Sequence, residues 1–189
     1  MGNTRREEIL EAAMDLFAEH GYRGASLDQI AERVGLTRQG LLHYFPSKKK
    51  LLIALLGRRE ELNREHLVAD HLAEKDWPTQ VAEAVAFDRE HPALARIHTI
   101  LMAESLTEGH PAREYFRDHQ RTVREHITRR LSERYGDRLP SGLSTQAAAA
   151  ALLALIEGLQ QQWLLDLDQT DHPEVMRSVW SVLLGPTTP

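Results

Sequence analysis

The sequence contains no cysteine, which excludes disulfide bonds, thiolate metal sites and cysteine nucleophiles. It also has no long apolar run. The longest covers residues 147–156, about half of the roughly 20 residues that a membrane-spanning helix needs. The first 17 residues are charged and amphipathic, without the apolar core of an export signal. We therefore expect a cytoplasmic protein with no membrane partner.

Motifs of catalysis and metal binding are missing as well. The chain has no glycine-rich phosphate loop, no GxSxG and no HExxH. Among the ten histidines, His91 and His98 share a helix face, as do His119 and His126, but neither pair has further ligands at metal-binding spacing. We expect no catalytic residue, no metal and no cofactor.

Apolar residues recur every three to four positions along most of the 189 residues, and no stretch alternates as a strand would. Helix-capping residues precede the first four of these stretches: Thr4, Ser26, Thr37 and Ser47. Hydrophobic residues make up 42% of the chain, enough for a buried core. The sequence predicts an all-α fold of about nine helices.

Charge is unevenly distributed between the two ends of the chain. The net charge is −5, but residues 1–59 carry +3 and residues 60–189 carry −8. A mildly basic N-terminal part can approach a polyanion while an acidic body stays away from it.

A helix-turn-helix is predicted over residues 26–44, where two short helices are separated by Gly35 and Leu36. The second helix begins with polar residues, at the positions that face base edges in a major groove. Arginine pairs with guanine and glutamine with adenine. The alternative for this face is simple solvation. The residues expected to contact DNA are Ser26, Thr37, Arg38, Gln39, Gly40, His43, Tyr44 and Lys48.

Residues 5–56 resemble the DNA-binding head of the TetR family of bacterial transcriptional regulators, through "ILEAAMDLFAEHGYRGASLDQIAERVGL" followed by "TRQGLLHYFPSKKKLL". The resemblance implies a homodimer that binds double-stranded operator DNA through two half-sites. It also implies a DNA-binding domain over residues 1–50 and an effector-binding and dimerisation domain over residues 51–189. Two positions depart from the family pattern: Leu42 replaces a frequent aromatic phosphate contact, and Gln39 replaces a frequent glycine.

Two apolar stripes in the C-terminal part each contain a histidine, His98 and His119. A polar group within an apolar lining is how a pocket orients a small molecule, although a satisfied core histidine gives the same pattern. The residues predicted to line an effector pocket are Leu62, His98, Met102, Phe116, His119, Val123 and Trp163.

Residues 147–159 are almost all apolar, so their helix must be covered on more than one side. One face carries small residues and, with the last helix, can form a symmetric four-helix interface. The segment "AALLALIEGLQQQWLL" also resembles the family's dimer-forming helix. The alternative is an internal helix of a monomer. Predicted interface residues are Ala151, Ala154, Gly158, Gln162, Leu165, Val179, Trp180 and Leu183.

These features favour a sequence-specific transcriptional regulator, a repressor released from its operator by an unidentified small molecule. Two alternatives stay open: a dimeric DNA-binding protein without small-molecule input, and an all-α enzyme. A ligand that lowers operator affinity separates the first two, and turnover of that ligand identifies the third.

Overall fold

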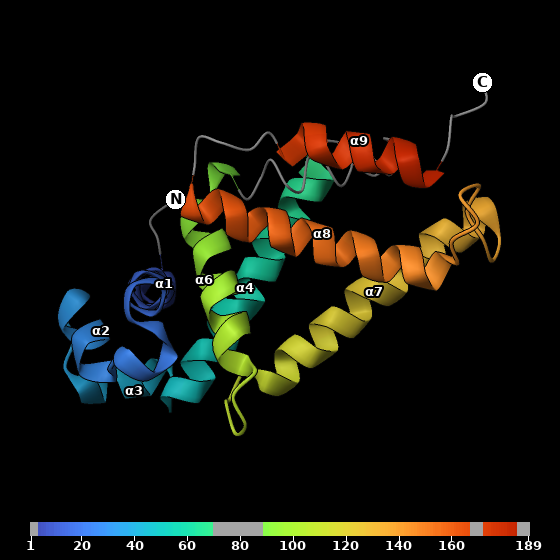
Figure 1. Cartoon of the computed structure of the whole chain (residues 1–189). Coiled ribbons are helices and arrows are strands. Elements are labelled where there is room, and N and C mark those ends of the chain that lie inside the picture. The colour runs from blue at the N-terminus through green and yellow to red at the C-terminus, as the bar shows by residue number, and fades with distance from the viewer. Residues whose placement is uncertain (1–3, 70–88, 167–171, 185–189) are drawn as a thin grey trace. The chain divides into compact units, whose positions relative to one another are not determined.

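The computed structural model describes residues 4–69, 89–166 and 172–184. These ranges contain eight helices and no strand, which confirms the predicted all-α fold (Figure 1). The helices are α1 (Arg5–Gly24), α2 (Leu27–Arg33), α3 (Arg38–Tyr44), α4 (Lys48–Ala69), α6 (Pro92–Ser105), α7 (Arg113–Tyr135), α8 (Thr145–Leu165) and α9 (His172–Leu184). None of them has the length and apolar character needed to cross a membrane.

The predicted helix starts are confirmed by their hydrogen bonds. Each capping side chain accepts a bond from the backbone N–H three residues later, at 3.1–3.4 Å: Thr4, Ser26, Thr37 and Ser47. Thr4 and Ser26 form full capping boxes, in which Glu7 and Gln29 bond back to the cap backbone. Each cap contributes about 1 kcal/mol to helix stability.

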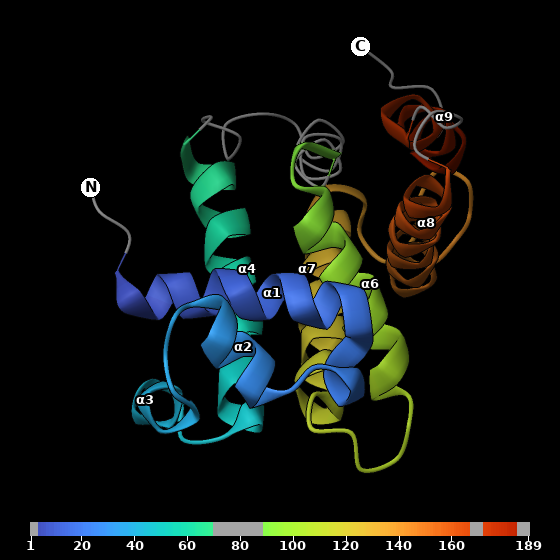
Figure 2. The ribbon, with the colours of Figure 1, turned by 90° about the vertical axis from the view of Figure 1, so that its left-hand side faces the viewer.

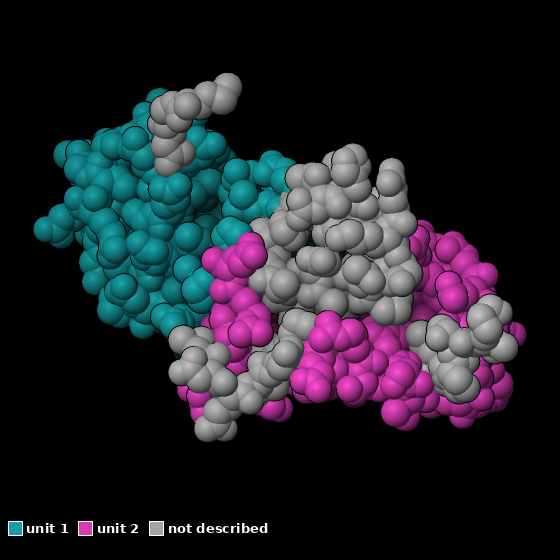
Figure 3. Space-filling model, turned by 90° about the horizontal axis from the view of Figure 1, so that it is seen from above, with its two compact units in different colours: residues 1–65, 91–116 teal, residues 66–90, 117–189 magenta. Residues whose placement is uncertain are grey.

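The chain packs as two compact units, which Figure 3 colours separately. The first comprises residues 1–65 and 91–116, and the second comprises residues 66–90 and 117–189. This division reflects which residues of the chain pack together, and it differs from a division by function. The functional boundary between residues 50 and 51 stays a prediction.

The first unit holds the helix-turn-helix against a core shared by α1, α4 and α6. In Figure 2, α1 crosses both α4 and α6, and it packs directly against α6. The largest fully buried side chains of this core include Phe17, Ile30, Leu41, Phe45, Leu51, Ile97 and Leu101. Because α2 and α3 each supply a buried residue to this core, the orientation of α3 is fixed by packing.

The second unit has its own core, built from residues 117–135 of α7 together with α8 and α9. Its buried residues include Ile127, Leu131, Ala148, Leu152, Leu159, Met176 and Trp180. Ala148, Leu152 and Leu159 of α8 are thus buried within the protomer, as expected for a helix that is covered on one side by its own chain.

The first helix bends near its C-terminus, at Gly21. This residue is buried and has φ 68° and ψ 178°, a conformation that is essentially restricted to glycine. A Cβ atom at this position would lie 2.3 Å from the Glu104 Oε1 atom of α6. The helix continues beyond this bend to Gly24.

Gly21→Ala is expected to lower the free energy of unfolding by about 1–3 kcal/mol, because alanine disfavours this backbone conformation. Displacement of Glu104 adds to the loss. Gly57→Ala is the matched control, since a Cβ atom at this α4 position meets open space and alanine favours helix. Urea unfolding of both variants measures the difference. An unchanged unfolding free energy for Gly21→Ala would contradict the assigned strain.

Candidate nucleic-acid interface

The turn between α2 and α3 is built by local hydrogen bonds and one glycine. Gly35 has φ 65°, and its N–H donates to Glu32 O at 3.0 Å. The Leu36 N–H donates to Ala31 O at 2.8 Å, and the Leu36 side chain packs against the core. The predicted pair of short helices is therefore present, with a left-handed turn residue where glycine carries no steric penalty.

The exposed side of α3 carries most of the polar residues predicted to contact DNA. Arg38, Gln39 and His43 are exposed, and Tyr44 is 37% exposed. On the opposite side, Leu41 and Phe45 are buried. This division leaves the polar face of α3 available to a partner while the apolar face fixes the helix.

Arg38 forms an ion pair within the protein. Its Nη1 atom lies 3.4 Å from the Asp28 Oδ2 atom of α2, and both side chains are well exposed. Exposed pairs of this kind contribute about 0–1 kcal/mol, so a base edge can compete for the guanidinium. We did not identify Asp28 from the sequence, because an acidic residue in a first helical turn also suits the helix dipole.

Two of the predicted contacts, Ser26 and Thr37, are engaged in local structure. The hydroxyls of Ser26 and Thr37 cap α2 and α3, as described above. A Cβ atom at Gly40 would make only ordinary van der Waals contacts with Thr37 and Leu36. Packing within the protein therefore does not require glycine at position 40, and its role at DNA stays a prediction.

Lys48, the first residue of α4, is half-buried. Its Nζ atom lies 4.5 Å from the centre of the Tyr22 ring. Burial lowers the pKa of Lys48, while the nearby Glu104 carboxylate opposes that shift. The neighbouring Lys49 and Lys50 are exposed.

Two arginines of α1 hold the ends of the helix-turn-helix, and we did not identify either from the sequence. Arg6 donates from Nη1 to Tyr44 O at 3.3 Å, and its guanidinium lies 4.3 Å from the centre of the Phe45 ring. Arg5 donates from Nη2 to Val34 O. Both interactions satisfy carbonyls at helix C-termini. The partners lie 29 and 38 positions away, so no local pattern predicts them.

The predicted pocket residues are divided between the two units. Leu62, His98, Met102 and Phe116 belong to the first unit, and His119, Val123 and Trp163 belong to the second. His98 is buried, and its ring packs edge-on against Phe116 with centroids 5.3 Å apart. Whether these seven residues line one pocket stays a prediction.

The predicted dimer face is largely exposed on the protomer. Ala151, Ala154, Gln162 and Leu165 are exposed, and Leu165 is 90% exposed. A Cβ atom at Gly158 would meet nothing within 4 Å. Val179 and Leu183 are half-buried. Trp180 is buried within the protomer core, so the interface that we propose below leaves its side chain out.

Within the described ranges, no three histidine or acidic side chains converge as metal ligands would.

Comparison with known protein families identifies the family of this chain. Residues 9–55 match the model of bacterial regulatory proteins of the tetR family. Residues 77–184, more than half of the chain, match the model of the BetI-type transcriptional repressor C-terminal domain. The chain belongs to the tetR family of bacterial regulatory proteins.

Individual relatives agree with this membership of the tetR family. The transcriptional repressor AcnR of Corynebacterium diphtheriae is 34% identical over 130 residues. The regulator SrpR of Pseudomonas putida is 28% identical over 96% of this chain and 86% of its own. The crystal structure of NalD from Pseudomonas aeruginosa has a TM-score of 0.76 and 29% identity, and the match covers 97% of both chains. The match to AcnR spans 68% of this chain and 64% of AcnR.

Proposed function

We propose that this tetR-family member is a dimeric, sequence-specific operator-binding repressor that a small molecule releases from DNA. The observation that carries the proposal is the division of α3, whose buried residues fix the helix while Arg38 and Gln39 face outward at its N-terminus. This is the arrangement of a recognition helix in a major groove. The names of AcnR and NalD as repressors support repression over activation.

Dimerisation is supported by the apolar surface of α8 and α9. Leu165 and Val182 are 90% and 76% exposed, and the alanines at 151 and 154 lie on the same helix as the open position at Gly158. Small residues allow two helices to approach closely. A symmetric pairing of this surface would place one recognition helix in each half-site.

Control by a small molecule is supported more indirectly. His98 is a buried titratable residue set among apolar side chains of α6 and α7, which suits a ligand with an apolar body and one polar group. NalD is described as the secondary repressor of the MexAB-OprM multidrug efflux pump. We accordingly propose amphipathic aromatic compounds as the first effectors to test.

A footprint on the intergenic DNA beside the gene tests the function directly. The expected result is a protected region with two half-sites, about 34–36 Å apart or a multiple of that distance. An active compound raises the melting temperature of the free protein and weakens protection. Operator DNA must then weaken binding of that compound by the same factor. Absence of any protected region would overturn the proposal, and protection that no compound changes would leave a DNA-binding dimer without effector.

A further inference from the structure

A compact polar cluster lies where the end of α1 meets the start of α4 and the end of α6. It consists of Tyr22, Lys48, Glu104 and His110, all within the first unit. The Nζ atom of Lys48 lies over the Tyr22 ring, and the His110 ring meets the same ring edge-on with centroids 5.2 Å apart. The end of α1 and the start of α4 thus meet the end of α6 through polar and charged side chains.

Glu104 contacts two other members of this cluster, Tyr22 and His110. Its Oε2 atom accepts a hydrogen bond from the Tyr22 N–H at 2.8 Å and lies 3.7 Å from the His110 Nε2 atom. The carboxylate rests directly on Gly21, where a side chain would occupy its place. A backbone donor and the absence of a Cβ atom therefore fix the position of this negative charge.

His110 is held in one tautomer beside Glu104. Its side chain is 2% exposed, and its Nδ1 atom accepts from the Ala112 N–H at 3.3 Å. The neutral ring therefore carries its proton on Nε2, the atom nearer to Glu104. A second proton on Nδ1 would require the Ala112 interaction to break, but it would give the ring a charge opposite to that of Glu104.

The charged and titratable groups around His110 come from three helices. Tyr22 and Arg23 belong to α1, Glu104 to α6, and Lys48, whose Nζ atom lies over the Tyr22 ring, to α4. Burial lowers the pKa of His110, Glu104 opposes this shift, and Arg23 adds to it. Arg113 is engaged elsewhere, since its Nη1 atom donates to Leu106 O at 2.6 Å.

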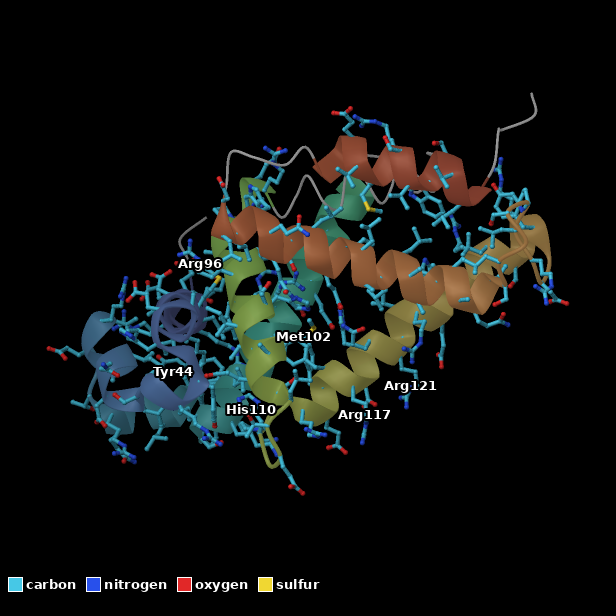
Figure 4. All side chains as sticks on the ribbon, in the orientation of Figure 1. Tyr44, Arg96, Met102, His110, Arg117 and Arg121 are labelled. Carbon is cyan, nitrogen blue, oxygen red and sulfur yellow. The ribbon has the colours of Figure 1, made fainter. Side chains whose placement is uncertain are left out.

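The cluster lies at the same end of the first unit as the recognition helix. In Figures 1 and 2, α3, the start of α4 and the segment after α6 all lie at the lower end of this unit. Figure 4 places His110 there. A phosphate that approaches Lys48 from this end would also be repelled by the negative charge of Glu104. This repulsion weakens the attraction between the phosphate and Lys48.

We infer that Glu104 weakens the phosphate contact of Lys48, and that a proton bound by His110 offsets the charge of Glu104 when DNA binds. The inference rests on the proposed DNA-binding function. With neutral His110, the four side chains of the cluster carry one positive charge, on Lys48, and one negative charge, on Glu104. With protonated His110 the cluster is net positive, and the attraction of a phosphate to Lys48 is stronger. DNA affinity therefore rises as pH falls toward and through the pKa of His110, which lies below its ordinary value.

Binding of the full-length protein to a fluorescent random-sequence DNA duplex tests this inference, because phosphate contacts do not depend on sequence. Affinity is measured between about pH 5.5 and 8.5 at two salt concentrations. Glu104→Gln keeps an oxygen for the Tyr22 N–H but removes the charge. It should bind about two- to fivefold more tightly at the upper end of this range. Its rise in affinity should move to lower pH, because His110 loses its carboxylate partner.

His110→Gln should remove the His110 part of the pH dependence. His20→Gln is the matched control, because His20 is an exposed histidine of α1 outside the cluster, and its profile should follow that of the unmodified protein. Any contribution from exposed His43 is common to all variants and cancels in the comparison. Thermal melting at each pH establishes that every variant is folded.

Each outcome decides between the two proposals. Equal affinities and superimposable pH profiles for Glu104→Gln and the unmodified protein would overturn the role of Glu104 and leave the DNA-binding function intact. Retention of the full pH profile in His110→Gln would overturn the proton balance. Failure of the unmodified protein to bind duplex DNA at any pH would overturn the proposed function together with this inference. If His110→Gln does not fold, the pH shift in Glu104→Gln still decides.

Discussion

Gly158→Leu is expected to convert the proposed dimer into monomers and to weaken operator binding by about a hundredfold or more. Among the described residues beyond its own stretch of helix, no atom lies within 4 Å of a Cβ added at this position, so this part of the protomer has room for a leucine. The added bulk would instead separate two α8 helices that approach through small residues. A monomer reads one half-site and loses the gain from linking two contacts, which is typically 10²–10⁴-fold.

Sedimentation and operator titration measure the two effects of Gly158→Leu. Ala103→Leu, at an exposed position of α6, adds the same apolar side chain away from α8 and should leave both properties unchanged. Circular dichroism should show the same helix content in both variants. A Gly158→Leu dimer with normal operator affinity would place the interface on another surface.

Arg38→Ala is expected to relax base preference at one position in each half-site and to cost about 1–3 kcal/mol of binding free energy. Its guanidinium is exposed at the N-terminus of α3 and is held only by the weak pair with Asp28. A base that accepts two hydrogen bonds gains more from the arginine fork than a carboxylate in water does. The loss of binding free energy should therefore appear on operators that carry the preferred base and be absent on operators that carry another base at this position.

Lys48→Ala provides the contrasting variant for this measurement. It should weaken binding to all operator variants alike and reduce the salt slope by roughly one unit, because a phosphate contact carries no sequence information. Titrations of single-base operator variants at several salt concentrations separate the two patterns. A uniform loss for Arg38→Ala across all bases would exclude base reading by this residue.

Local patterns in the sequence were sufficient to predict the helices and caps of the proposed DNA-binding face. The caps at Thr4, Ser26 and Thr37 each form a bond to a backbone group three residues away, so both partners are visible in one short stretch. The recurrence of apolar residues every three to four positions likewise predicts that each helix has one buried side, as Leu41 and Phe45 show in α3. Such interactions depend on helix geometry alone, which is the same in any fold.

The polar contacts that hold this face were decided only by the tertiary structure. Arg6 reaches Tyr44 across 38 positions, and Tyr22 reaches Glu104 across 82. The sequence also placed Trp180 at the interface, because an apolar periodicity does not distinguish a face covered within the protomer from one covered by a partner.

The sequence by itself determined an all-α chain with a helix-turn-helix and the polar residues of its recognition helix, because these follow from periodicity and capping over a few residues. The tertiary structure decided which charges surround Lys48, why Gly21 must be glycine and which arginines bind the C-terminal carbonyls of α2 and α3. Those properties arise where segments distant in sequence meet, and the partner of a side chain there is set by packing of the whole unit.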